Sequence, residues 1–132
     1  EEARALWHFG RHIGMAFQVV DDLLDVTATA DKLGKPVGSD LASGVLTLPV
    51  IHMLSLPGTD EWVYEVLSNP PLSPDNVQRI LQLLRSNGTI EYTQSVADSF
   101  IAQAKHELQK VPQGPITKLL GSIADLVVAR ES

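Results

Sequence analysis

The chain of 132 residues is 44% hydrophobic and 20% charged, a balance that predicts one globular domain with a single core. Its formal net charge of −6 argues against a nucleic-acid partner, because proteins that bind phosphate backbones carry a basic excess on at least one face. The sequence has no cysteine and no run of 18 apolar residues, which excludes a disulfide framework and argues against a transmembrane segment. We therefore expect a soluble, cytoplasmic protein.

The N-terminal part of the chain has the pattern of one long helix. Apolar residues recur there at spacings of three and four, which predicts a helix from Ala3 to about Val26. The chain begins at Glu1 within this pattern, and we expect it to be a piece of a longer polypeptide. Residues 27–49, TATADKLGKPVGSDLASGVLTLP, contain three glycines and two prolines, which predicts a loop with at most a short turn of helix.

Three helices are predicted in the middle of the chain. The first runs from about Pro49 to Leu56, and the second follows Asp60 as its cap and runs to about Leu67. Ser73 is expected to cap the third helix, with Pro74 in its first position, where the missing N–H of proline costs nothing.

The last part of the sequence predicts two more helices. Gly88 has the place of a left-handed residue past a helix end, and Thr89 is expected to cap a helix that runs to near Pro112. A final helix is predicted from Ile116 to about Arg130. We expect five of its apolar side chains to point inward: Leu119, Leu120, Ile123, Leu126 and Val127. Because no alternating strand pattern is present, the predicted fold class is all-α.

Four polar residues of the first helix share one side of it. On a helical wheel, Gln18, Asp21, Asp22 and Asp25 fall within an arc of about 100°, while apolar residues occupy most of the remaining circumference. Because carboxylates one turn apart repel each other, this arrangement suggests a bound cation, and oxygen ligands suit Mg²⁺. The alternative is an ordinary solvated acidic face near a helix end.

The glycine-rich loop after this helix contains two lysines. In the stretch LGKPVGSDL, Lys35 stands among glycines whose backbone N–H groups can approach an anion closely, and Lys32 adds a second positive charge. This predicts a partner for a phosphate group, and a simple turn is the alternative.

Two segments together resemble a known family. GMAFQVVDDLLD followed by LGKPVGSDLASGVLTLP is similar to the second aspartate-rich region of the trans-isoprenyl (polyprenyl) diphosphate synthases, and the similarity spans the whole chain. The resemblance implies an isoprenoid-synthase-type helical bundle, of which residues 1–132 would be the C-terminal portion. It also implies a Mg²⁺-dependent prenyltransferase that condenses isopentenyl diphosphate with an allylic diphosphate, with a long-chain product and a homodimeric or heterodimeric assembly.

The resemblance also implies roles for individual residues. Asp21 would ligate one Mg²⁺ directly, with Asp22 and Asp25 acting through bound water or closing the shell. Among the substrate contacts, Lys35 would hold the allylic diphosphate. Gln18 and Phe17 would lie beside the reacting substrate.

The chain departs from the family pattern in two ways. Val45 stands where many members have a lysine, and the first aspartate-rich motif is absent from these 132 residues. We therefore expect the chain to be inactive by itself. Two alternatives remain: a non-catalytic helical subunit that completes a partner synthase, and a terpene cyclase of similar fold.

Overall fold

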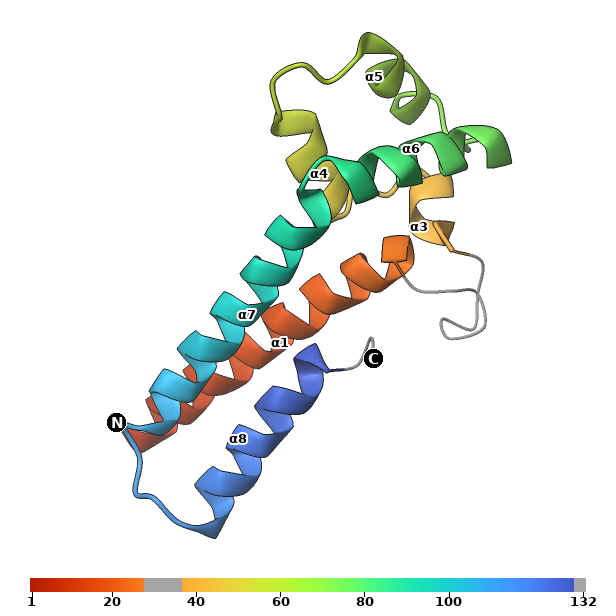
Figure 1. Cartoon of the computed structure of the whole chain (residues 1–132). Helices are drawn as coiled ribbons and strands as arrows, with labels where there is room; N and C mark the ends of the chain where they lie inside the picture. Colours follow the sequence, from red (N-terminus) through yellow and green to blue (C-terminus); the bar gives the residue numbers. More distant parts are fainter. Residues whose placement is uncertain (28–36, 130–132) are drawn as a thin grey trace. The chain divides into compact units, whose positions relative to one another are not determined.

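The computed structural model describes residues 1–27 and 37–129, and every regular element within these ranges is a helix. Figure 1 shows the helices along the chain, which are α1 (Glu2–Thr27), α3 (Ser39–Ala42), α4 (Leu48–Ser55), α5 (Glu61–Leu67), α6 (Pro74–Ser86), α7 (Thr89–Leu108) and α8 (Pro115–Val128). The predicted all-α class is confirmed. None of the described helices is both long and apolar enough to cross a membrane.

The chain divides into two compact units. Unit 1 comprises Glu1–Asp21 and Gln94–Ser132, and unit 2 comprises Asp22–Thr93. Two helices, α1 and α7, therefore begin in one unit and end in the other.

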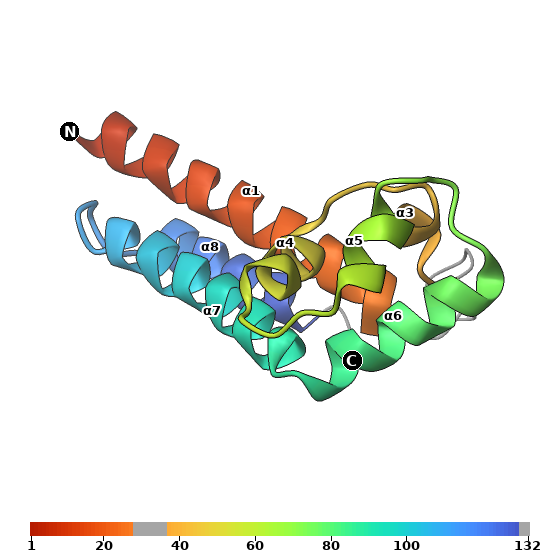
Figure 2. The same cartoon turned by 90° about the horizontal axis from the view of Figure 1, so that it is seen from above.

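Unit 2 is organised around α6, which contacts α3 and α4 and shares a core with α5 (Figures 1 and 2). The apolar stripe of α6 is fully buried, as its spacing predicts. It belongs to a core that draws on every helix of the unit, and its buried members are Val26, Leu41, Val50, Met53, Val63, Leu72, Val77, Ile80, Leu81 and Leu84. Unit 2 thus closes around its own hydrophobic core.

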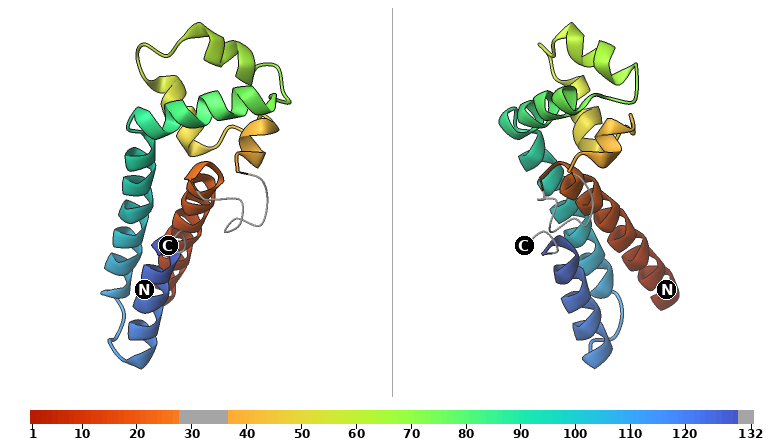
Figure 3. Two further views of the ribbon diagram at one scale, coloured as in Figure 1. Left: turned by 45° about the vertical axis from the view of Figure 1, so that its right-hand side comes forward. Right: turned by 90° about the vertical axis from the view of Figure 1, so that its right-hand side faces the viewer.

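Unit 1 is built from α7, α8 and most of α1. Both views in Figure 3 show α8 running back along α7, and an ion pair between Lys105 and Asp125 joins these two helices. Many of the buried apolar side chains in this unit are small, and its buried alanines are Ala5, Ala16, Ala97, Ala104 and Ala124. Small side chains let helix axes approach closely, so unit 1 packs its helices over short side chains.

The orientation predicted for α8 is largely wrong. Leu119, Ile123 and Leu126 are 57%, 41% and 65% exposed, whereas Val127 is buried as expected. Because apolar residues occupy more than half of the circumference of α8, the sequence alone does not decide which arc packs inside the unit. The arc that packs is the one with Thr117, Ala124 and Val127.

The predicted helix caps have mixed outcomes. The Ser73 hydroxyl accepts a hydrogen bond from the Asn76 N–H at 3.2 Å, which confirms it as the cap of α6, and Gly88 is left-handed at φ 85° as expected. Asp60 precedes α5 as predicted, but its side chain makes no capping hydrogen bond. Thr89 is already the first residue of α7, and its hydroxyl lies 3.2 Å from His52 Nδ1. The hydroxyl therefore contacts another helix of unit 2.

Candidate metal and diphosphate site

Asp25 accepts three hydrogen bonds from backbone N–H groups of the segment that follows residue 36. Its carboxylate oxygens accept hydrogen bonds from the N–H of Asp40 at 3.2 Å and of Leu41 at 3.4 Å. Its main-chain carbonyl accepts the N–H of Gly38 at 2.7 Å. The Asp25 residue is only 1% exposed. The N–H groups in the first turn of α3 lack partners within that helix, so Asp25 satisfies donors that would otherwise remain unpaired.

Asp22 has a similar relation to the next helix. One of its carboxylate oxygens accepts the N–H of Leu48, the first residue of α4, at 3.2 Å. Thr47, which precedes α4, makes no side-chain capping hydrogen bond. The cap of α4 therefore comes from 26 residues earlier in the chain.

The C-terminal end of α1 is satisfied by an arginine of α6. Arg85 donates from Nε and Nη2 to the carbonyl of Val26, at 3.2 and 3.1 Å. The last turn of α1 contains no basic residue of its own, and its final carbonyl groups need donors from elsewhere. Sequence reasoning missed this contact because its partners are 59 residues apart.

Gly38 is held between Asp25 and α6. Its φ is 80°, a conformation that L side chains rarely adopt, and a Cβ atom at this position would lie 2.8 Å from Cγ1 of Val77. Both the backbone conformation and the available space therefore require glycine, which is one of the residues that carry the family resemblance.

The remaining predicted site residues are placed as follows. Asp21 is half-buried and ends the first segment of unit 1, and Gln18 and Phe17 are exposed in the same unit. Lys35 and Lys32 lie outside the described residues. In residues 1–27 and 37–129, no three His, Asp or Glu side chains come together in a group that could hold a metal ion.

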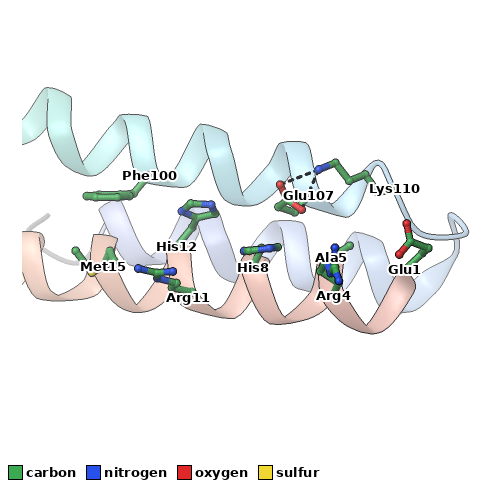
Figure 4. A pocket seen from close by; sticks show the side chains of 10 residues that line it. All are labelled: Glu1, Arg4, Ala5, His8, Arg11, His12, Met15, Phe100, Glu107 and Lys110. Carbon is green, nitrogen blue, oxygen red and sulfur yellow. Dashed lines mark hydrogen bonds and ion pairs between the residues drawn. The ribbon is translucent and has the colours of Figure 1, made fainter.

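An open groove of about 710 Å³ lies between α1 and α7 within unit 1. Figure 4 shows His12 of α1 near Phe100 of α7, and His8 further along α1 toward Glu107 of α7. Lys110, which follows α7, lies beside Glu107. Lys110 donates to both carboxylate oxygens of Glu107 at 3.2 and 3.0 Å, and this hydrogen bonding lowers the pKa of Glu107. None of the sequence-predicted site residues that the structure describes, Phe17, Gln18, Asp21, Asp22 and Asp25, lines this groove.

Residues 1–84 match the family described as polyprenyl synthetase. The matched range runs from the start of the chain to the last turn of α6. The chain belongs to the polyprenyl synthetase family. The resemblance seen in the sequence is thereby confirmed.

Curated relatives in this family are prenyl diphosphate synthases of several product lengths. The chain is 33% identical to heptaprenyl diphosphate synthase component 2 of Bacillus subtilis (strain 168), over 97% of this chain and 36% of that protein. It is 34% identical to nonaprenyl diphosphate synthase of Mycobacterium tuberculosis, over 98% of this chain and 39% of that protein. The chain thus spans less than half the length of these polyprenyl synthetase relatives and corresponds to their C-terminal part.

Solved structures of the family have the same fold as this chain. Heptaprenyl diphosphate synthase from Staphylococcus aureus superposes with a TM-score of 0.85 at 32% identity, over 98% of this chain and 40% of that one. Polyprenyl synthase from Caulobacter crescentus, solved with calcium and isoprenyl diphosphate, gives 0.88 at 28% identity, with coverages of 98% and 40%. The helical arrangement is therefore that of isoprenoid synthases.

Proposed function

We propose that residues 1–132 form the C-terminal portion of a polyprenyl synthetase domain, in a Mg²⁺-dependent prenyltransferase that condenses isopentenyl diphosphate with an allylic diphosphate. The observation that carries this proposal is a set of hydrogen bonds between two segments of the sequence. Asp25 and Asp22 of α1 accept N–H groups at the starts of α3 and α4, which lie in the LGKPVGSDLASGVLTLP region. These are the two segments that resemble the synthases, and both fall within the matched residues 1–84.

The acidic end of α1 is the proposed metal side of the site. Asp21 ligates Mg²⁺ directly, and Asp22 and Asp25 belong to the outer part of the shell. Carboxylate oxygens fit this ion, which prefers hard oxygen ligands and retains several of its waters. When bound, the metal stabilises negative charge on the departing diphosphate. The description of Caulobacter crescentus polyprenyl synthase with calcium and isoprenyl diphosphate supports a divalent-cation site in the family.

The proposed substrate contacts come from residues that precede and follow the aspartates in the sequence. Lys35 binds the allylic diphosphate as a positive point charge. Gln18 and Phe17, both exposed on α1, lie beside the substrate. A long-chain product is proposed, and the heptaprenyl and nonaprenyl names of two relatives support it.

The chain by itself is proposed to be inactive. It supplies one acidic segment, whereas the mechanism requires a second aspartate-rich motif on a facing helix. The exposed apolar side chains of α8, which include Ile116 at 68% and Leu126 at 65%, support a further polypeptide portion that covers them. That portion belongs either to the same polypeptide or to another chain of a homodimer or heterodimer.

A role as a non-catalytic subunit of a two-component synthase is the second candidate function. The names of two relatives, heptaprenyl diphosphate synthase component 2 of Bacillus subtilis and decaprenyl-diphosphate synthase subunit 1 of Schizosaccharomyces pombe, support the assembly from more than one component that this role requires. In this role, the chain would stabilise a partner without contributing metal ligands.

A chimeric enzyme separates the two candidates. It joins the part of the Staphylococcus aureus synthase that precedes the aligned region to residues 1–132, and incorporation of labelled isopentenyl diphosphate is measured with farnesyl diphosphate as the allylic substrate. We expect product from the chimera, none from the 132-residue chain alone, and a loss of about 100-fold or more on Asp21→Ala with helicity unchanged. An active chimera that tolerates Asp21→Ala would contradict the metal-ligand role and favour the non-catalytic subunit.

A further inference from the structure

Asp25 differs from the other two aspartates of its motif in how completely the protein encloses it. It is 1% exposed, whereas Asp21 and Asp22 are half-buried. We propose that Asp25 is a positioning residue, whose carboxylate holds the Gly38–Leu41 turn against α1 and does not ligate the metal ion directly. For its consequence in catalysis, this inference rests on the function proposed above.

The hydrogen bonds account for both oxygens of the Asp25 carboxylate. Oδ1 accepts the N–H of Asp40 and Oδ2 accepts the N–H of Leu41. A carboxylate removed from water is costly unless hydrogen-bond donors replace the lost hydration, and these two N–H groups are such donors. Direct binding to Mg²⁺ would require the buried oxygens to exchange these donors for an ion that keeps several waters, in a place with almost no solvent access.

The turn that Asp25 holds is fixed from its other side as well. Leu41 is 1% exposed within the core of unit 2, and Gly38 fits closely against Val77 of α6. The Asp25 main-chain carbonyl and carboxylate therefore bind three N–H groups of a segment that is already anchored in the core. Loss of the carboxylate releases one face of the turn and leaves the other in place.

Asp22 gives a matched comparison within the same unit. Its carboxylate caps α4 at Leu48, so the two aspartates hold two successive helices of the segment that follows residue 36. Asp21, the last residue of the first segment of unit 1, keeps the direct-ligand role proposed above. The second aspartate-rich motif then combines one metal ligand with two residues that fix the backbone.

Amide hydrogen exchange of the 132-residue chain, followed by NMR without metal, tests this assignment. The N–H groups of Asp40 and Leu41 both donate to the Asp25 carboxylate, so the change in their protection when that carboxylate is removed reports its contribution. We expect both to be protected, and to exchange at least about tenfold faster in Asp25→Ala. In the same variant, the Gly38 N–H should keep its protection because its acceptor is the Asp25 main-chain carbonyl.

Asp22→Ala is the matched control, since it removes the acceptor of the Leu48 N–H and should accelerate exchange there while leaving Asp40 and Leu41 unchanged. Exchange of Asp40 and Leu41 at free-peptide rates in the parent chain would overturn the proposal, whether or not the Asp25 variant folds. Unchanged exchange at the Asp40 and Leu41 amides in a folded Asp25→Ala chain would also overturn the proposal.

The chimeric synthase supplies a second readout that distinguishes positioning from ligation. Excess Mg²⁺ compensates for a weakened direct ligand by mass action, so it should partly restore activity to Asp21→Asn. It should not restore activity to Asp25→Asn, because the defect lies in the turn. Restoration of Asp25→Asn by excess Mg²⁺ would contradict the inference, whereas an inactive parent chimera would count against the proposed function and leave the exchange result to decide the role of Asp25.

Discussion

The two units of this chain differ in the size of the apolar side chains that they bury and in the number of large ones that they leave exposed. Unit 2 encloses large aliphatic side chains in one continuous core, and side-chain hydrogen bonds cap several of its helices. Unit 1 buries several alanines and leaves a set of large apolar side chains exposed on α1 and α8: Leu6, Trp7, Met15, Phe17, Ile116, Leu119, Ile123 and Leu126. An exposed apolar set of this size is typical of a surface that another polypeptide covers. Unit 2 leaves a smaller set exposed, namely Val45, Leu46, Ile51, Tyr64 and Tyr92. The comparison teaches that, among the described residues, the larger exposed apolar surface belongs to unit 1.

The largest expected effect on the free energy of unfolding comes from a substitution in the core of unit 2, and it contrasts with a substitution on the surface of α8. Ile80→Ala should lower the free energy of unfolding of unit 2 by about 2–5 kcal/mol, because Ile80 is 0% exposed and its loss leaves a cavity. Leu119→Ala, at a residue that is 57% exposed, should change the stability of unit 1 by less than about 0.5 kcal/mol. Urea unfolding followed by NMR signals from each unit measures both values, and equal losses would refute the contrast.

A smaller effect tests the fit of the turn in unit 2. Gly38→Ala should destabilise the unit by about 2–4 kcal/mol, because it adds a left-handed alanine and a close approach to Val77. Gly58→Ala is the matched control: its φ is 84°, but no atom lies within 4 Å of the added Cβ. It should cost only the backbone strain of about 1–2 kcal/mol. If thermal unfolding shows the same loss for both variants, the close packing of Gly38 is not a constraint.

Removal of a helix cap should lower the free energy of unfolding by about 1 kcal/mol. Ser73→Ala should destabilise α6 by about this amount, since it removes the acceptor for the Asn76 N–H. Asp60→Ala stands at the corresponding position before α5, where the side chain makes no capping hydrogen bond, and should change stability by less than about 0.5 kcal/mol. Chemical denaturation of the two variants compares the caps directly, and a larger loss for Asp60→Ala would reverse the assignment.

The smallest expected effect is in unit 1 and concerns the lowered pKa of Glu107, caused mainly by its hydrogen bond from Lys110. A carboxyl group with a lowered pKa in the folded state stabilises that state above its ordinary pKa, and this contribution is lost as the pH falls through the folded-state pKa. Lys110→Ala should therefore raise the pKa of Glu107 toward its ordinary value. An NMR titration of the Glu107 carboxyl group checks the direction, and an unchanged midpoint would exclude the hydrogen bond as the cause.

The features that the sequence predicted correctly depend on local patterns. The helix predicted from Ala3 to about Val26 is observed as Glu2–Thr27, and the Ser73–Pro74 signal marks the start of α6. These elements follow from side-chain spacing and from contacts between residues three or four positions apart. The family resemblance was equally readable, because it rests on a run of particular residues in two adjacent segments.

The features that the sequence did not predict depend on tertiary packing. The caps that Asp22 and Asp25 provide join residues 15 to 26 positions apart, and no local pattern indicates them. The packed arc of α8 was missed for a related reason: a helix that is apolar over most of its circumference has two candidate inner faces. In this chain, the face with small side chains packs within unit 1, and the face with Leu119 and Leu126 remains exposed.

Amide hydrogen exchange of α8, measured in the 132-residue chain and again in the chimeric synthase, tests most directly that the chain is one portion of a polyprenyl synthetase domain. The account predicts that α8 amides gain protection in the chimera, where the added portion covers Ile116, Leu119, Ile123 and Leu126. Over the same comparison, the amides of Ile80, Leu81 and Leu84 should remain equally protected, because the core of unit 2 is already closed. Unchanged exchange along α8 in a folded chimera would contradict the account.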